Sequence, residues 1–228
     1  MPDNGPLPPS SNGRLYSPGN LRFAYTPLVI RLSHPYLWGI PNAVLHRLYR
    51  ECVGRHHLEV GPGNGHFLRR LPQFARPEVL HLLDVHPGPL RVAEARLRSE
   101  ASVRTHLADA LAPWPVEPGS LDSVVACMVM HTLPSEDVPG IRGKAALVAE
   151  AARALRFDGV FGGAAILAGG AGVRPTRYGP RAMDNYNKRG WFDNTADTRE
   201  DLEAVLRGHF RRVRLTLHGS VAVWRAVR

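Results

Sequence analysis

The sequence has few cysteines and no long hydrophobic run. Its two cysteines, Cys52 and Cys127, are too few for a disulfide framework or a zinc site, so we expect a reducing, cytoplasmic setting and no metal. No apolar stretch approaches the roughly 20 residues of a membrane-spanning helix, and we expect no membrane partner. The N-terminal stretch MPDNGPLPPSSNG is polar and rich in proline, unlike a secretory signal peptide.

Lysine is also scarce, although the chain is strongly basic. The net charge is +9, yet Lys144 and Lys188 are the only lysines among 29 basic residues. Residues 205–228 contain six arginines and no acidic residue, and such a surface can bind nucleic acid. No aromatic-interleaved basic motif accompanies these arginines. The sequence therefore favours another kind of partner, with RNA binding at the C-terminal surface as the alternative.

What the sequence does have is enough apolar residues for one domain with a core, 44% of 228. Residues 1–20 are rich in Pro, Gly, Asn and Ser, which predicts a flexible tail. Residues 21–56 are apolar and aromatic and predict a helical cap that contributes to substrate binding, with Asn42 capping a helix from Ala43 to Cys52. Residues 57–228 form the main domain, with a Gly-rich, aromatic insertion at 168–197.

Strand and helix patterns alternate through the main domain. Near-continuous apolar strands between amphipathic helices predict a doubly wound, mostly parallel α/β sheet. The last residues predict an antiparallel hairpin that turns at residues 218–220, for seven strands in all. The expected strands are 57–60, 79–85, 103–109, 121–130 and 159–167, and the expected helices are 65–74, 86–100, 141–156 and 198–210.

A glycine-rich loop, EVGPGNG at residues 59–65, follows the first strand. Ligands of doubly wound sheets bind at the carboxyl ends of the strands, and glycines let the backbone approach a ligand closely. A dinucleotide-binding loop would place its third glycine at position 66 or 68, where this chain has His66 and Leu68. The lysine of a phosphate-binding loop is absent as well.

The spacing of an acid, any residue and three alternating glycines resembles the first motif of the class I S-adenosylmethionine-dependent methyltransferases. Asp84 ends the second strand and Asp109 follows the third, where this family contacts the ribose hydroxyls and the adenine amino group of the cofactor. The resemblance covers about residues 50–167, although Phe157-Asp158-Gly159 stands where the family usually has Pro-Gly-Gly. It implies a Rossmann-like methyltransferase fold, S-adenosyl-L-methionine as cofactor, and cofactor contacts from Glu59, Gly61, Pro62, Gly63, Gly65, Asp84, Val85, Asp109, Ala110 and Met128.

His131 follows the fourth strand and is the candidate general base, since an imidazole titrates near neutral pH. The alternative is a histidine that only hydrogen-bonds the loop after this strand. His66 and His86 flank the cofactor loops and are expected to line the pocket.

The acceptor pocket is expected from the cap and the insertion, through Tyr25, Tyr36, Trp38, Tyr186 and Trp191. Aromatic surfaces suit a flat or prenyl-like small molecule, and the alternative is that they pack as a lid on the sheet. We therefore expect O-, C- or N-methylation of a small molecule in secondary metabolism. The alternatives are an RNA methyltransferase and a catalytically silent cofactor-binding partner protein, and a homodimer is left open.

Overall fold

The computed structural model describes residues 26–135 and 137–228 of the chain. The predicted tail at 1–20 and the candidate residue Tyr25 lie outside the described residues. The predicted cap is represented by a π-helix, η1 (Thr26–Leu37), and by α2 (Asn42–Cys52). The insertion contains one helix, α6 (Gly179–Lys188).

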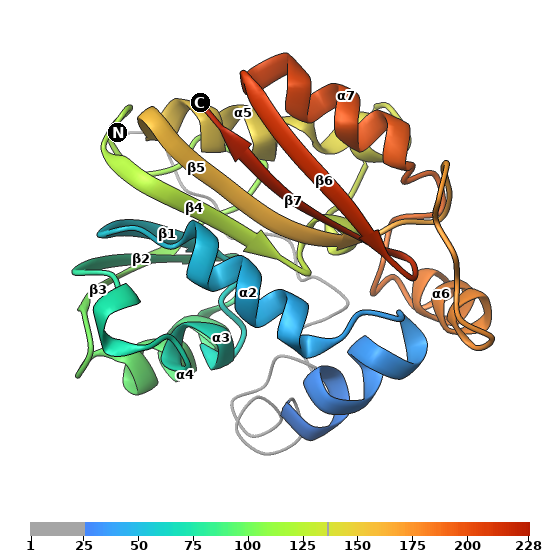
Figure 1. Ribbon diagram of the computed structural model, residues 1–228, viewed down its shortest axis with the longest axis horizontal. Helices are drawn as coiled ribbons and strands as arrows, with labels where there is room; N and C mark the ends of the chain where they lie inside the picture. The colour runs from blue at the N-terminus through green and yellow to red at the C-terminus, as the bar shows by residue number, and fades with distance from the viewer. Residues whose placement is uncertain (1–25, 136) are drawn as a thin grey trace.

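One seven-stranded sheet organises the molecule, which confirms the predicted fold class (Figure 1). The strand order is β3-β2-β1-β4-β5-β7-β6. The first five strands are parallel, and β7 lies antiparallel between β5 and β6. Their bounds are β1 (His56–Val60), β2 (Val79–Asp84), β3 (Ser102–Leu107), β4 (Leu121–Cys127), β5 (Leu155–Ile166), β6 (Arg212–His218) and β7 (Val221–Val227).

Helices cover both faces of the sheet, and each face has its own apolar core (Figure 1). On one face α2 buries Leu45, Leu48 and Cys52, whose three- and four-residue spacing gives a helix an apolar stripe. None of the described helices combines the length and the apolar character needed to cross a membrane. The face of the sheet that α2 covers also carries α3 (His66–Arg69) and α4 (Pro87–Leu97). The other face carries α5 (Ala145–Ala154) and α7 (Arg199–His209). Short 3₁₀ turns are η2 (Gln73–Ala75), η3 (Met130–Thr132) and η4 (Ile141–Lys144).

Several predicted boundaries were wrong, for local reasons. The fourth strand ends at Cys127 rather than at residue 130, because Met128 turns the chain with a φ of 60°. The helix expected at 65–74 is only four residues long, and Pro72 precedes a separate 3₁₀ turn. Asn42 is the first residue of α2 rather than its cap, and its side chain instead bonds His34.

Residues 157–159, expected as a turn before the fifth strand, lie inside β5 where its pairing with β4 shifts register, and an aspartate stands where the family usually has a glycine. Asp158 has a φ of 64°, a left-handed conformation that Asp tolerates better than most residues. Its carboxylate pairs with Arg211 and Arg212, which lie beside the start of β6. Asp158 therefore adopts the left-handed backbone of this irregularity without a glycine.

We predict that Gly163→Ala in β5 destabilises the protein by about 1–3 kcal/mol, because the core has no room for a methyl group. A Cβ at Gly163 would lie 2.0 Å from Cζ2 of Trp224, its partner on β7. The measurement is the free energy of unfolding in urea. Gly208→Ala in α7 is the matched control, since a Cβ there meets nothing within 4 Å, and it should stabilise by up to about 1 kcal/mol. Equal free energies for the two variants would contradict this packing.

Candidate functional site

The site lies where the strand order reverses. From β1 the chain continues outward to β2 and β3, and from β4 it continues in the opposite direction to β5. β1 and β4 are hydrogen-bonded neighbours, so the loops after them diverge and leave a crevice at their carboxyl ends. The glycine loop follows β1 and therefore borders this crevice.

The glycine loop needs its glycines. Gly61, Gly63 and Gly65 have φ values of 64°, 54° and 70°, in the left-handed region that favours glycine. At Gly61 a Cβ would also lie 2.4 Å from Cγ2 of Val129, in the loop after β4. The N–H of Gly61 donates to the carbonyl of Leu83 at 2.8 Å, which ties the loop to the end of β2. Both neighbouring strand ends thus hold the loop in place.

A buried hydrogen-bond network fixes Glu59, the first residue of the EVGPGNG segment, two positions before Gly61. The Tyr49 hydroxyl donates to Glu59 Oε1 at 2.5 Å, and His57 Nε2 lies 3.2 Å from Oε2. His57 Nδ1 bonds Ser123 Oγ at 2.8 Å, and this oxygen accepts the N–H of Gly54 at 2.7 Å. Burial raises the pKa of Glu59, and the bonds from His57 and Tyr49 oppose that rise. These hydrogen bonds connect α2, β1 and β4 beneath the glycine loop.

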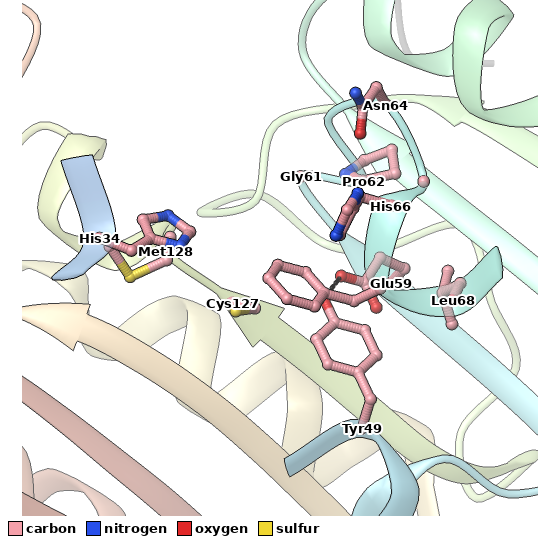
Figure 2. A pocket seen from close by; sticks show the side chains of 12 residues that line it. His34, Tyr49, Glu59, Gly61, Pro62, Asn64, His66, Leu68, Cys127 and Met128 are labelled. Atoms are coloured by element: carbon pink, nitrogen blue, oxygen red, sulfur yellow. Dashed lines mark hydrogen bonds between the residues drawn. The ribbon is translucent and has the colours of Figure 1, made fainter. Parts of the chain in front are cut away.

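A pocket opens above Glu59 (Figure 2). In Figure 2, His34 and Met128 lie on one side, Pro62, Asn64 and His66 lie on the other, and Glu59 and Tyr49 form the floor. The lining residues are His34, Tyr49, Glu59, Gly61, Pro62, Asn64, Gly65, His66, Phe67, Leu68, Cys127 and Met128. Five of the predicted cofactor contacts therefore line this pocket: Glu59, Gly61, Pro62, Gly65 and Met128.

The remaining predicted contacts are outside this pocket, and Gly63 is part of the glycine loop itself. The other four lie at or just beyond the ends of β2 and β3, along the same edge of the sheet: Asp84, Val85, Asp109 and Ala110. The N–H of Ala108 donates to the carbonyl of Asp84, so the ends of β2 and β3 stay in register beyond the strands. Asp84 Oδ1 accepts the N–H of His86 at 2.8 Å, and burial raises the pKa of Asp84 to about 7. Asp109 lies two residues beyond β3, in a turn where its Oδ1 accepts the N–H of Leu111.

This donor set fits the cofactor that the sequence resemblance implies. The strand ends that carry the glycine loop and Asp84 are paired, Val60 with Leu83, so a carboxylate stands beside the loop. A carboxylate accepts two hydrogen bonds, as neighbouring ribose hydroxyls require. In the left-handed glycine turn beside the N-terminus of α3, the N–H groups of Gly61 and Gly65 donate to Leu83 and Pro62, and Gly63 offers its N–H to a ligand carboxylate. The residues present therefore suit S-adenosylmethionine.

The structure does not support the base role predicted for His131. Its side chain is buried, with 2% exposed, and its Nδ1 accepts the N–H of Ile166 at 3.3 Å. A neutral ring bound this way holds its proton on Nε2 and has no free lone pair. Burial and the charge of Lys144 lower its pKa to about 3. This geometry corresponds to the alternative, a histidine that fastens the loop after β4 to β5.

The predicted acceptor residues divide into two groups. Trp38, Tyr186 and Trp191 meet in one aromatic cluster together with Phe192, and Trp38 is 6.0 Å from Tyr186 and 5.6 Å from Phe192 between ring centroids. Trp38 is 2% exposed and packs in the core, as the lid alternative expects. Tyr36 is 68% exposed and does not join the cluster. The cap and the insertion thus come together beside His131, whose ring lies 4.5 Å from Phe192, but none of these aromatic residues lines the pocket.

A buried ion pair that the sequence analysis did not identify anchors the insertion. Lys144 Nζ lies 2.9 Å from both carboxylate oxygens of Asp197, and both side chains are fully buried. Lys144 also donates to the carbonyl of Asp193, whose N–H donates to the carbonyl of His131. The amide of Asn194 donates to the carbonyl of Ile166 at 3.0 Å. The end of the insertion is therefore fixed over the carboxyl ends of β4 and β5.

Sequence reasoning missed three pocket residues that come from the cap and β4. His34, Tyr49 and Cys127 line the pocket. Tyr49 follows the helical stripe of α2 and looks like an ordinary core residue, while His34 sits in a π-helix, whose spacing gives no periodic signal. His66, which was expected to line the pocket, does so, whereas His86 does not. For Lys144 a signal existed, since it is one of two lysines in an arginine-rich chain.

Comparison with known proteins gives one family and consistent relatives. Residues 58–162 match a family model described as a methyltransferase domain. The chain is 33% identical over 202 residues to demethylluteothin O-methyltransferase of Streptomyces thioluteus, covering 89% of this chain and 85% of that protein. It is 30% identical to the physcion biosynthesis cluster O-methyltransferase of Aspergillus chevalieri, covering 97% of each. Among solved structures it resembles Haemonchus contortus phosphoethanolamine N-methyltransferase 2 in complex with phosphomonomethylethanolamine and S-adenosylhomocysteine. That likeness has a TM-score of 0.63 at 17% identity and covers 90% of this chain and 45% of that one.

We predict that Lys144→Met destabilises the protein by about 3–5 kcal/mol, because it leaves the Asp197 carboxylate buried without its partner. Adding Asp197→Leu to this variant should recover most of the loss. Lys188→Met is the matched control, since Lys188 pairs with Asp184 on the surface and its loss should cost less than about 1 kcal/mol. Urea unfolding of the three variants measures these differences. A similar loss for both single lysine variants would show that the buried pair does not anchor the insertion.

Proposed function

Because this chain belongs to the class I S-adenosylmethionine-dependent methyltransferase family, it is a methyltransferase enzyme, and we propose that it methylates a hydroxyl oxygen of a small aromatic molecule in secondary metabolism. The two relatives named above support oxygen as the acceptor atom, since both are called O-methyltransferases and both match over most of their length. Nitrogen is the second candidate atom, because another relative, 34% identical over 184 residues, is called an N-methyltransferase.

The observation that carries the proposal is the pairing of the glycine loop with Asp84 at the strand-order reversal. When bound, S-adenosylmethionine supplies a methyl group already activated on a sulfonium centre. The loop N–H groups would hold the cofactor carboxylate, and Asp84 the ribose hydroxyls. Glu59 would orient the loop from below through its bond with Tyr49. The protein then contributes mainly alignment of the acceptor with the methyl group, an effect of about 7–11 kcal/mol in favourable systems.

The acceptor would enter from the side of the pocket where the cap and the insertion meet. His34 and Met128 line this side of the pocket. The aromatic cluster of Trp38, Tyr186 and Phe192 joins the cap to the insertion next to His131. Aromatic side chains with few charges favour a flat, apolar acceptor.

The basic C-terminal surface lies away from this site. Arg212 pairs with Val227 in the β6–β7 ladder, and Val227 pairs with Val160 near the start of β5. Arg211 and Arg228 adjoin the same end, opposite the carboxyl ends of β1 and β4. Arg211, Arg212 and Arg228 therefore lie at the opposite end of the sheet from the glycine loop, which favours the small-molecule acceptor.

The experiment that tests this function is turnover of S-adenosylmethionine with a panel of phenols, aromatic amines and short RNAs. We expect S-adenosylhomocysteine to form with one or more phenols and the product to carry a new O-methyl group. Product from amines alone would replace oxygen by nitrogen as the acceptor atom. Product from RNA alone would overturn the small-molecule assignment, and cofactor binding without any turnover would favour the silent partner protein.

We predict that the affinity for S-adenosylmethionine falls about fivefold between pH 8 and pH 6, an effect of about 1 kcal/mol. The pKa of Asp84 is about 7, so Asp84 is ionised at pH 8 and accepts from both ribose hydroxyls, whereas its protonated form at pH 6 accepts less well. Isothermal titration calorimetry at both pH values measures this change. Asp84→Asn should bind more weakly and with little pH dependence over this range. An unchanged pH dependence in that variant would assign the effect to another group.

A further inference from the structure

His34 occupies a place in the pocket that the sequence analysis did not anticipate. It comes from η1 in the cap and lines the pocket together with Met128, across from the glycine loop (Figure 2). Its side chain is 2% exposed, and its ring lies parallel to that of Phe67 at a centroid distance of 6.4 Å. Its backbone carbonyl accepts the N–H of Ile40 at 3.1 Å. The imidazole is therefore held in a defined position on the acceptor side.

The bond between His34 and Asn42 determines which ring nitrogen carries the proton. His34 Nδ1 lies 3.0 Å from Asn42 Oδ1. An amide oxygen only accepts hydrogen bonds, so Nδ1 must be the donor, and the neutral ring then keeps its lone pair on Nε2. Among the described residues, no hydrogen bond engages that Nε2.

His34 and His131 thus have opposite tautomers. In His131, Nδ1 accepts from Ile166 and the proton is on Nε2, while in His34 the lone pair is on Nε2. A general base needs a lone pair within reach of the acceptor proton, so only His34 has the required form. Both side chains are 2% exposed, and they differ in the hydrogen-bond partner of Nδ1 and in that His34, but not His131, lines the pocket.

We propose that His34 is the general base that accepts the proton of the acceptor hydroxyl, with Asn42 as the residue that positions it. The proposal rests on the proposed O-methyl transfer. The acceptor O–H bond breaks and its proton goes to Nε2, the oxygen forms a bond to the methyl carbon, and the carbon–sulfur bond breaks with its electron pair returning to sulfur. The products are the methyl ether, S-adenosylhomocysteine and an imidazolium that returns its proton to solvent.

The surroundings of His34 keep it neutral and able to accept a proton. Burial lowers its pKa, and the bond to Asn42 opposes that shift. The titratable groups around it are His66 on α3, His131 in η3, Glu59 on β1, Tyr49 on α2 and Cys127 on β4. Burial raises the pKa of both Tyr49 and Cys127, so these two groups are neutral near pH 7. Burial lowers the pKa of both histidines, to about 4 for His66 and about 3 for His131, so neither adds a positive charge near neutral pH.

The test compares His34→Gln and Asn42→Asp with His46→Gln as the matched control. His46 belongs to the same aromatic group around Phe67, at 5.0 Å between centroids, but does not line the pocket. With a hydroxyl acceptor, we expect His34→Gln to lower kcat by about 10²–10⁴-fold, with the dissociation constant of S-adenosylmethionine within about twofold of wild type. His46→Gln should keep wild-type kcat.

Asn42→Asp gives a result that a merely structural role would not produce. A carboxylate on Nδ1 stabilises the imidazolium and raises the pKa of His34, so the acidic limb of the kcat/KM profile should move to higher pH by about one unit or more. The substitution is compatible with the fold, because an acid at the first residue of α2 favours the helix N-terminus. An unmoved limb would overturn the assignment.

A further readout needs neither cofactor nor acceptor. Long-range ¹H–¹⁵N spectra of the free protein, assigned with His34→Gln, should show a protonated Nδ1 and an unprotonated Nε2. A proton on Nε2, or full turnover by His34→Gln, would overturn the base role while leaving the methyltransferase function in place. Failure of the wild-type protein to bind S-adenosylmethionine would instead contradict the proposed function.

Discussion

The structure around the pocket depends on the buried carboxylate of Glu59. It accepts from Tyr49 on α2 and bonds His57, which reaches β4 through Ser123. A carboxylate with this little solvent contact must be hydrogen-bonded on both oxygens, so it holds the cap, the first strand and the fourth strand in one arrangement. Gly61, the first glycine of the loop, follows two residues after Glu59, and the position of the loop follows from this arrangement.

Much of the fold followed from the sequence because burial on both faces gives parallel strands a simple signature. The order of elements and the terminal hairpin were predictable for that reason. The ends of the elements were less predictable, because they depend on single residues. The φ of 60° at Met128 ends β4, and a methionine in the sequence does not indicate such a conformation. Pro72 marks the end of the helix after the glycine loop, whereas the apolar spacing around it favours a longer helix.

The site was predictable where one local motif defines it and not where distant segments meet. The glycine loop is contiguous, so its spacing alone indicated a cofactor site, and five predicted residues line the pocket. His34 and Tyr49 enter from the cap, and Lys144 meets Asp197 across 53 residues, contacts that only the folded chain brings about. His131 lies four residues beyond the end of β4, in η3, and the protonation of its ring depends on Ile166, which donates to it from β5. A residue's position can thus be read from its neighbours in sequence, whereas its protonation is set by its neighbours in space.

The most direct test of the central claim is a crystal structure of the protein with S-adenosylhomocysteine. The account predicts the amino-acid end of that molecule against residues 61–65, its ribose hydroxyls on Asp84, and its sulfur facing His34 and Met128. A molecule bound at another place, or a crevice between β1 and β4 filled by side chains, would contradict the account.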